Sequence, residues 1–476
     1  MWPKLIIFIV LVAIVEAQHH AEEMQHNSNS FSFELKHRHV HVHRFNNNRP
    51  ETQHERFKDL LHHDIIRHNI TCHRLQTRRR AGEAVSSAPS IELPLNPGSD
   101  LGIGQYITTL KVGTPSQMFR VIVDTGSDLT SVRCRYRCSK RAGGGSGDCS
   151  MKGRINGRRV FHAPLSSSFR PVPCSSERCK VELITLFSIT TCPTPLTPCG
   201  YDYGYADGSV ARGVFADETV TIGLTNGRKT RLRNVLIGCS DSYQGPVFNN
   251  VDGLLGLGNT KHSFATYAAE KFGRKFSYCL VDHLSNINAT SYITFGASRN
   301  PVKLSGNVRR TTLELQALVP FYAVNVRGIS VDGKMLEIPM KVWDVTQGGG
   351  TILDSGTSLT FLTDPAYQAV MEALTMSVSK YQRVKLDAVP MDYCFNSTGF
   401  NETLVPKLII HFDDGARFKP HWNNYVITVG GGVKCLGFVP ARFPGVSVIG
   451  NIMQQNYFWE YDLAGKKLSF APSACS

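Results

Sequence analysis

Val123-Asp124-Thr125-Gly126-Ser127-Asp128-Leu129-Thr130 and Leu353-Asp354-Ser355-Gly356-Thr357-Ser358-Leu359-Thr360 are two copies of one pattern, in which a hydroxyl residue and a glycine follow an aspartate. Each copy follows a short β-branched or aliphatic run, which predicts a buried strand. The glycine permits a tight turn directly after that strand. A single Asp-Thr-Gly is ordinary turn chemistry. Two copies with matching flanks, one in each half of the chain, predict a duplicated lobe and two carboxylates that meet on a pseudo-twofold axis.

Such a pair of carboxylates has its own chemistry. Two carboxyl groups held a few ångströms apart cannot both ionise, so they share one proton. The ionised member can take a proton from a bound water while the protonated member donates to a carbonyl oxygen, without a metal or other cofactor. Asp124 and Asp354 are therefore the predicted catalytic residues. We expect four hydroxyl residues to support them, Thr125 and Ser355 across the axis and Ser127 and Thr357 on the outer carboxylate oxygens.

Further motifs follow in a fixed order. Gln105–Thr108 and Val112–Pro115 precede the first aspartate, Tyr205-Ala206-Asp207-Gly208-Ser209 comes later, and apolar-apolar-Gly segments occur at Asp252–Gly258 and Ser447–Asn451. From Gln105 to the C-terminus the chain resembles the pepsin-like aspartic peptidases, in particular their plant nepenthesin-like branch. The resemblance implies an all-β, bilobal pepsin-like acid-protease fold, with two pseudo-twofold-related β lobes and a few short helices. It also implies an aspartic endopeptidase that hydrolyses polypeptides.

The resemblance assigns further roles. Tyr205 would be the flap tyrosine that closes over substrate, and Gly126, Gly356 and Thr357 would contact the substrate. One position departs from the family pattern, because Ser131 stands where the family usually has a tryptophan whose indole N–H reaches the flap tyrosine. A serine hydroxyl is too short for that contact. We therefore expect a looser flap, with lower activity or altered specificity, since flap closure excludes water and orients the scissile bond.

The expected secondary structure is mostly β. Strands at Tyr106–Val112 and Phe119–Val123 bracket a turn that enters the first aspartate loop, and Asp332-Gly333 predicts a hairpin turn in the second half. Phe264–Phe272 and Pro365–Met376 are the better helix candidates. We expect an N-terminal lobe over residues 81–300, which holds the first aspartate, a cysteine-rich insertion and the flap. A C-terminal lobe with the second aspartate would span residues 301–476.

The N-terminal region differs from the rest. Met1–Ala17, with Lys4 before an apolar run, predicts a secretory signal peptide that is too short to anchor in a membrane, and no later stretch is long and apolar enough to span one. Residues 18–80 hold 12 of the 17 histidines. By resemblance they are a basic propeptide that blocks the acidic cleft as an intramolecular inhibitor, and the alternative is a disordered linker. Because histidines gain charge below about pH 6.5, we hypothesise that they promote release in an acidic compartment.

Cysteine content agrees with secretion. There are 13 cysteines, of which Cys72 lies in the leader region and an even number follows it. After the resemblance, we expect Cys394 to pair with Cys435 and Cys279 with Cys475. A zinc site in the cysteine-rich stretch is the competing interpretation, and irregular spacing argues against it. The glycosylation candidates are Asn69, Asn288, Asn396 and Asn401. The expected location is the secretory pathway, ending in the extracellular space, the cell wall or a vacuole.

Charge leaves an alternative open. Lys and Arg number 52 against 38 Asp and Glu, a net charge of +14. A basic surface is compatible with nucleic-acid binding, but no dense basic helix stands out and we favour an ordinary solvated surface on a monomer. Another alternative is a catalytically weak or silent binding protein, like the plant inhibitors of microbial glycanases that share this fold. Such relatives typically lose an aspartate or the flap motif, and this chain keeps both.

Overall fold

In this computed structural model, the residues described below are 31–37, 64, 68, 105–136, 154–155, 158–186, 188–204, 209–223, 229–245, 248, 251–282, 291–296, 303–386 and 391–475. Several of the predictions lie outside this part of the chain. They are the signal peptide, the flap tip including Tyr205, and the sequons at Asn69 and Asn288.

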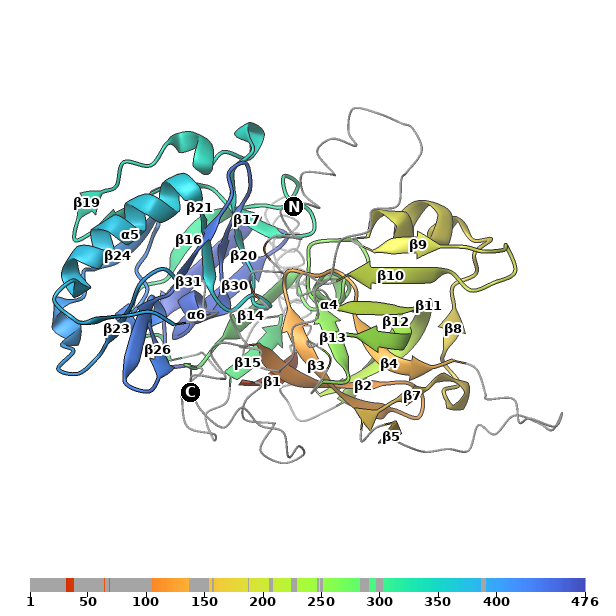
Figure 1. Ribbon diagram of the computed structural model, residues 1–476. Coiled ribbons are helices and arrows are strands. Elements are labelled where there is room, and N and C mark those ends of the chain that lie inside the picture. Colours follow the sequence, from red (N-terminus) through yellow and green to blue (C-terminus); the bar gives the residue numbers. More distant parts are fainter. Residues whose placement is uncertain are drawn as a thin grey trace, which may run out of the picture.

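The protein consists of two β-rich lobes, which lie side by side in Figure 1. The fold class expected from the sequence is thus confirmed, including the small number of helices. A six-stranded antiparallel sheet joins the lobes, in the order β1 (Phe31–His37), β15 (Ser291–Phe295), β14 (Lys275–Cys279), β30 (Tyr457–Asp462), β31 (Lys467–Pro472) and β16 (Arg309–Glu314). Its outer strands connect it to both lobes, because β1 also pairs with β2 and β16 also pairs with β17.

The first lobe is built on long strands. Its main elements are β2 (Tyr106–Val112), β3 (Gln117–Asp124), β4 (Ser131–Arg135), β10 (Gly200–Gly204), β11 (Val210–Gly223), β12 (Lys229–Gln244), β13 (Gly253–Gly256) and helix α4 (Phe264–Lys271). Shorter elements are β5 (Arg154–Ile155), β6 (Arg158–Arg159), β7 (Phe161–His162), β8 (Arg170–Pro171), β9 (Ile189–Thr191), and the short helices η1 (Ala163–Leu165), η2 (Arg178–Glu182) and η3 (Leu183–Thr185). Apolar residues that alternate along β2 and β3 face the core, where both strands are almost fully buried.

The second lobe repeats this plan with shorter strands. They are β17 (Tyr322–Val324), β18 (Val326–Val331), β19 (Lys334–Met335), β20 (Thr351–Leu353), β21 (Thr360–Thr363), β22 (Arg383–Val384), β23 (Cys394–Asn396), β24 (Leu408–Phe412), β25 (Arg417–Phe418), β26 (Val426–Gly430), β27 (Val433–Leu436), β28 (Phe438–Ala441) and β29 (Ser447–Ile449). The helices are α5 (Asp364–Val378), α6 (Asn451–Gln454), η5 (Met340–Val342), η6 (Val345–Gln347), η7 (Glu402–Leu404) and η8 (Trp422–Asn424). The turn at Asp332-Gly333 has positive φ at both residues, as a two-residue hairpin requires.

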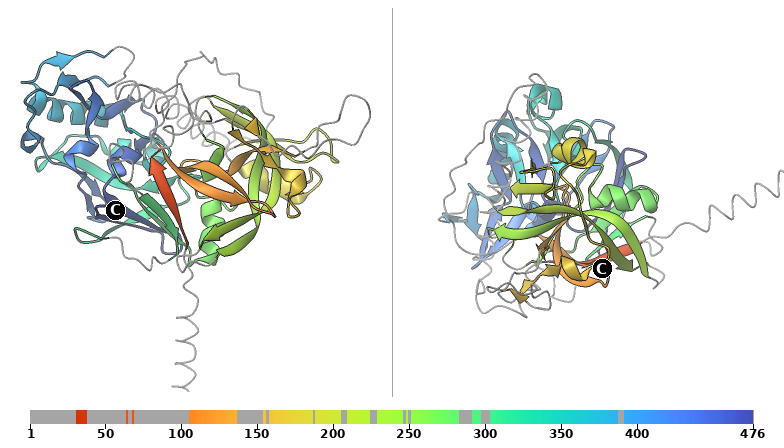
Figure 2. Two further views of the ribbon diagram at one scale, coloured as in Figure 1. Left: turned by 90° about the horizontal axis from the view of Figure 1, so that it is seen from below. Right: turned by 90° about the vertical axis from the view of Figure 1, so that its right-hand side faces the viewer.

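One strand was not foreseen. β1 lies within the stretch predicted to be the propeptide, yet it pairs with β15 and lies between the two lobes (Figure 2). Phe33 is buried there and its ring packs against Phe264 and Phe295. This part of the leader is therefore integrated into the sheet that joins the lobes.

Five disulfides are present among the described residues. Cys279 bonds Cys475 and Cys394 bonds Cys435, the two pairs expected from the sequence. In the first lobe Cys134 bonds Cys239, Cys174 bonds Cys192 and Cys179 bonds Cys199.

Candidate active site

Each predicted catalytic aspartate stands at the end of a buried strand. Asp124 is the last residue of β3, and Asp354 directly follows β20. A parallel strand supports each of them, β13 beside β3 and β29 beside β20. These supporting strands contain the apolar-apolar-Gly segments noted in the sequence. Both aspartates are buried, at 0% and 2% exposure, so solvent does not screen their carboxylates.

The two loops hold their carboxylates in the same way. In each, the backbone N–H two residues after the aspartate donates to Oδ1, and the hydroxyl three residues after it donates to Oδ2. The donors are Gly126 (3.0 Å), Ser127 (2.6 Å), Gly356 (2.8 Å) and Thr357 (2.7 Å). Ser127 and Thr357 therefore hold one oxygen of each carboxylate. These bonds fix the direction of both carboxyl groups.

The loops also bond to each other. The N–H of Ser355 donates to Oγ1 of Thr125 at 2.9 Å, and the N–H of Thr125 donates to Oγ of Ser355 at 3.1 Å. The Ser355 hydroxyl in turn donates to the carbonyl oxygen of Val123 at 3.1 Å. This reciprocal exchange joins the second residue of each loop and brings the two aspartate loops, 230 positions apart in the sequence, into contact. Serine in place of threonine in the second loop keeps the exchange intact.

Three of the residues predicted to contact substrate, Gly126, Gly356 and Thr357, lie at this centre. Gly126 and Gly356 are in the loops themselves, and Nε2 of Gln105 donates to the carbonyl oxygen of Gly356 at 2.7 Å. β10 and β11 form an antiparallel hairpin that flanks the segment containing Tyr205, with Gly204 opposite Val210. The two strands that would carry the predicted flap are thus both present and paired.

Sequence reasoning missed a contact between the first loop and this hairpin. The hydroxyl of Tyr203 donates to Oδ1 of Asp128 at 3.1 Å, and both side chains are buried. Asp128 lies within the quoted motif, but nothing in one sequence indicates its partner 75 positions away. The contact fixes β10 relative to the loop that holds Asp124.

Two leader residues lie against the second lobe, at and beside the second loop. The carboxylate of Asp64 accepts hydrogen bonds from the backbone N–H groups of Ser358, at 2.9 Å, and Leu359. His68 bonds the carbonyl oxygen of Val446 at 2.8 Å, and its ring stacks on Phe361 with centroids 4.5 Å apart. Burial lowers the pKa of His68 to about 4, although the bond to Val446 opposes the shift.

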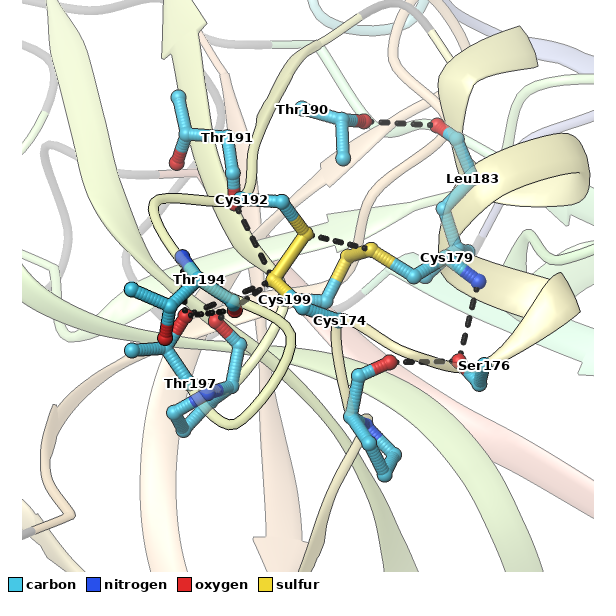
Figure 3. Close-up of a disulfide and its surroundings, with 12 residues drawn as sticks. Cys174, Ser176, Cys179, Leu183, Thr190, Thr191, Cys192, Thr194, Thr197 and Cys199 are labelled. Carbon is cyan, nitrogen blue, oxygen red and sulfur yellow. Dashed lines mark hydrogen bonds between the residues drawn. A yellow bond between two sulfur atoms is a disulfide. The ribbon is translucent and has the colours of Figure 1, made fainter.

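The described cysteines that cluster in the cysteine-rich region are disulfide-bonded. The sulfurs of Cys174, Cys179 and Cys192 lie within 4.8 Å of one another. Figure 3 shows these three residues side by side. Each is already bonded, Cys174 to Cys192 and Cys179 to Cys199. Because zinc binds the thiolate, these three cysteines are not a zinc site in this form of the protein.

Comparisons with known proteins bear on this centre. Family models described as "Xylanase inhibitor N-terminal" and "Xylanase inhibitor C-terminal" match residues 106–297 and 321–472. "Aspartyl protease family protein 2" of Arabidopsis thaliana is 34% identical over 80% of this chain and 73% of its own length. The chain belongs to the plant pepsin-like aspartic protease family. "Aspartic proteinase nepenthesin-1" of Nepenthes gracilis, another member of the family, is 31% identical over 90% of this chain and 92% of its own.

Solved structures agree on the fold. The crystal structure of basic 7S globulin from soybean superposes with a TM-score of 0.60 at 21% identity, over 78% of this chain and 92% of that one. That of conglutin gamma from lupine seeds superposes with a TM-score of 0.59 at 20% identity, over 77% and 91%. Both therefore share the bilobal architecture of the family. No helix in the described part of the chain is long and apolar enough to cross a membrane.

Proposed function

We propose that this member of the family is an active aspartic endopeptidase, made as a proenzyme in the secretory pathway. The observation that carries the proposal is the pair of matched, cross-bonded loops around Asp124 and Asp354. Relatives named as aspartic proteases support the same reading of the site.

The chemistry follows from the residues themselves. Asp124 and Asp354 share one proton and hold one water between them. The ionised carboxylate removes a proton from this water, which attacks the scissile carbonyl carbon, while the protonated carboxyl donates to the carbonyl oxygen. The donors at Gly126 and Gly356 keep both carboxyl groups oriented during these transfers. Aspartic proteases are the standard example of such a shared-proton pair.

Substrate binding is assigned to the surrounding loops. Gly126, Gly356 and Thr357 would contact an extended polypeptide, and Tyr205 would close over it from the flap. The hairpin β10–β11 supports this assignment, because β10, which precedes the segment with Tyr205, contacts the first loop through Tyr203 and Asp128. Closure would exclude bulk water from the reaction.

The proenzyme proposal rests on the leader. Asp64 and His68 lie against the residues that follow Asp354, and β1 occupies the edge of the sheet between the lobes. A leader attached at both places would restrict access to the site as an intramolecular inhibitor. Acid would favour its release, since undocked His68 takes up a proton more readily than buried His68.

The route of the protein is proposed from its N-terminus and cysteines. The apolar stretch within Met1–Ala17 and the five described disulfides support entry into the secretory pathway, with the extracellular space, cell wall or vacuole as destination. Asn396 and Asn401 lie near the surface of the second lobe, which supports them as glycosylation sites. We further propose that the protein is a monomer.

A second candidate is a catalytically silent binding protein. The descriptions of the two matching family models, which name xylanase inhibitors, favour it. Retention of both aspartates with all their hydrogen-bond donors favours the peptidase.

The deciding experiment is acid treatment of the purified full chain, with acid-denatured haemoglobin as substrate. We expect the leader to be removed and hydrolysis to begin, and a pepstatin-type inhibitor to block the hydrolysis. Asp124→Asn is the matched control, since it keeps the size of the side chain. Hydrolysis that persists in Asp124→Asn, or a folded wild type that cleaves nothing over the acid range, would contradict the proposal.

A further inference from the structure

Ser131 has a partner that its sequence context does not indicate. It is the first residue of β4 and is fully buried. The hydroxyl of Tyr243, near the end of β12, donates to Oγ of Ser131 at 2.9 Å. β12 thus brings a long polar ring to position 131, where the resemblance to the family had implied one on residue 131 itself.

The phenol ring of Tyr243 is itself held in place. It packs against Phe248 with centroids 4.1 Å apart, and the guanidinium of Arg133 lies 4.8 Å from its ring centre. Burial raises the pKa of Tyr243 to about 12, against the smaller opposing effect of its hydrogen bonds to Ser131 and Ser240. The hydroxyl thus stays protonated and remains a hydrogen-bond donor throughout the working range of an acid protease.

A second hydroxyl on the same strand reaches the flap hairpin. Oγ of Ser240, three residues before Tyr243 on β12, bonds the hydroxyl of Tyr201 at 2.5 Å. Tyr201 lies on β10, which leads into residues 205–208, and Tyr243 is paired with Ala211 on β11, which follows them. Two hydroxyl bonds therefore connect β12 to its neighbours, Tyr243 to the strand that leaves the first aspartate loop and Ser240 to β10, while β12 itself pairs with β11.

Space around Ser131 fits this arrangement. Gly238 pairs with Ser131 between β12 and β4, and a Cβ atom on Gly238 would lie 2.5 Å from the hydroxyl of Tyr201 and 3.1 Å from Cβ of Ser131. Only a residue without a side chain at 238 lets the hydroxyl residues approach each other this closely.

We propose that Tyr243, through its hydrogen bond to Ser131, is a positioning residue that helps to hold the β10–β11 hairpin beside the Asp124 loop. Positioning of a hairpin that closes on substrate rests on the proposed peptidase function, but the position of the hairpin itself can be measured without it.

The test compares amide hydrogen exchange in the peptide 201–212 of the full chain, wild type against Tyr243→Phe and Ser131→Ala. We expect exchange in this peptide to be about tenfold faster in each variant, because the removed hydrogen bond no longer opposes local opening. Because the two side chains act on one bond, the double variant should exchange no faster than the single ones. Tyr425→Phe is the matched control, since it removes a buried hydroxyl bond, to the carbonyl oxygen of Pro406 at 2.6 Å, in the other lobe.

A second readout separates positioning from general stability. At equal thermal stability, Tyr243→Phe should weaken pepstatin binding about tenfold, whereas Tyr425→Phe should leave it unchanged. Unchanged exchange at 201–212, or additive effects of the two substitutions, would overturn the inference even if the protein hydrolyses substrate. Faster exchange in variants of a wild type that hydrolyses nothing would support the positioning and count against the proposed function.

Discussion

The loop around Asp124 and the loop around Asp354 orient their carboxylates with the same set of donors, but they face different surroundings. The first loop is connected to the β10–β11 hairpin through Asp128 and Tyr203, and the strand that follows the loop is bonded to β12 through Ser131 and Tyr243. The second loop is instead in contact with the leader, through Asp64 and the nearby His68.

This difference separates two tasks. The proposed chemistry requires symmetry, since two equivalent carboxylates would share one proton and each needs the same support. Access to the site needs no symmetry. One lobe provides the hairpin proposed to close on substrate, and the other provides the backbone N–H groups that bond Asp64 of the leader.

The largest expected effect tests the symmetric part. Asp354→Asn should lower kcat/KM for acid-denatured haemoglobin by about 10³-fold or more, as much as Asp124→Asn, and the double variant should be no worse. The reason is that the two carboxyls act as one unit. Kinetics on the acid-treated chain measure this, and a residual activity that differs strongly between the single variants would break the symmetry.

The next effect concerns the leader. His68 has its ordinary pKa of 6.5 when undocked and a pKa of about 4 when docked. Docking is therefore fully stabilised above pH 6.5 and loses stability as the pH falls toward 4, by about 3 kcal/mol in all. His68→Phe keeps a ring to stack on Phe361 but cannot titrate, so its release should depend less steeply on pH.

Leader removal after stepwise acidification, followed on gels, measures this effect. His421→Gln, at an exposed histidine in the second lobe, is the control. Identical pH profiles for His68→Phe and wild type would show that His68 is not a trigger.

A smaller effect probes the bonds between the loops. Ser355→Ala leaves the buried N–H of Thr125 and the carbonyl oxygen of Val123 without this partner, which should cost about 2 kcal/mol of unfolding free energy. Ser355→Thr restores the hydroxyl and should change stability by less than about 1 kcal/mol. Denaturant unfolding of the inactive Asp124→Asn background measures both without self-digestion. Equal unfolding free energies of the Ser355→Ala and Ser355→Thr variants would argue against a stabilising role for the hydrogen bonds between the two loops.

The smallest effect sharpens the difference between the lobes. Ser131→Trp introduces an indole where Tyr201 and Tyr243 already surround position 131, so overpacking should destabilise the protein by about 1 kcal/mol or more and change the catalytic constants. Adding Tyr243→Gly makes room for the indole and should recover part of the lost stability. A tolerated Ser131→Trp with unchanged constants would refute this account of the position.

Local patterns accounted for much of the molecule. The strand at Tyr106–Val112 has the bounds expected from its alternation, and the helices at 264–271 and 364–378 lie within two residues of those predicted. These features depend on neighbours in the sequence, as does the turn at each aspartate. The duplicated motif also indicated that residues 125 and 355 meet, because a twofold axis relates equal positions.

Other features depended on contacts that no local pattern encodes. β1 has an ordinary strand sequence, and only its partner β15, some 260 positions away, places it between the lobes. Likewise the sequence around Ser131 predicted only that a tryptophan contact is missing. Tyr243 bonds Ser131 from β12, 112 positions later in the chain. The sequence by itself determined the two aspartate loops, because each is a short stretch with its own turn chemistry. Tertiary structure alone decided what surrounds each loop, because hydrogen bonds and packing between distant segments depend on their positions in space.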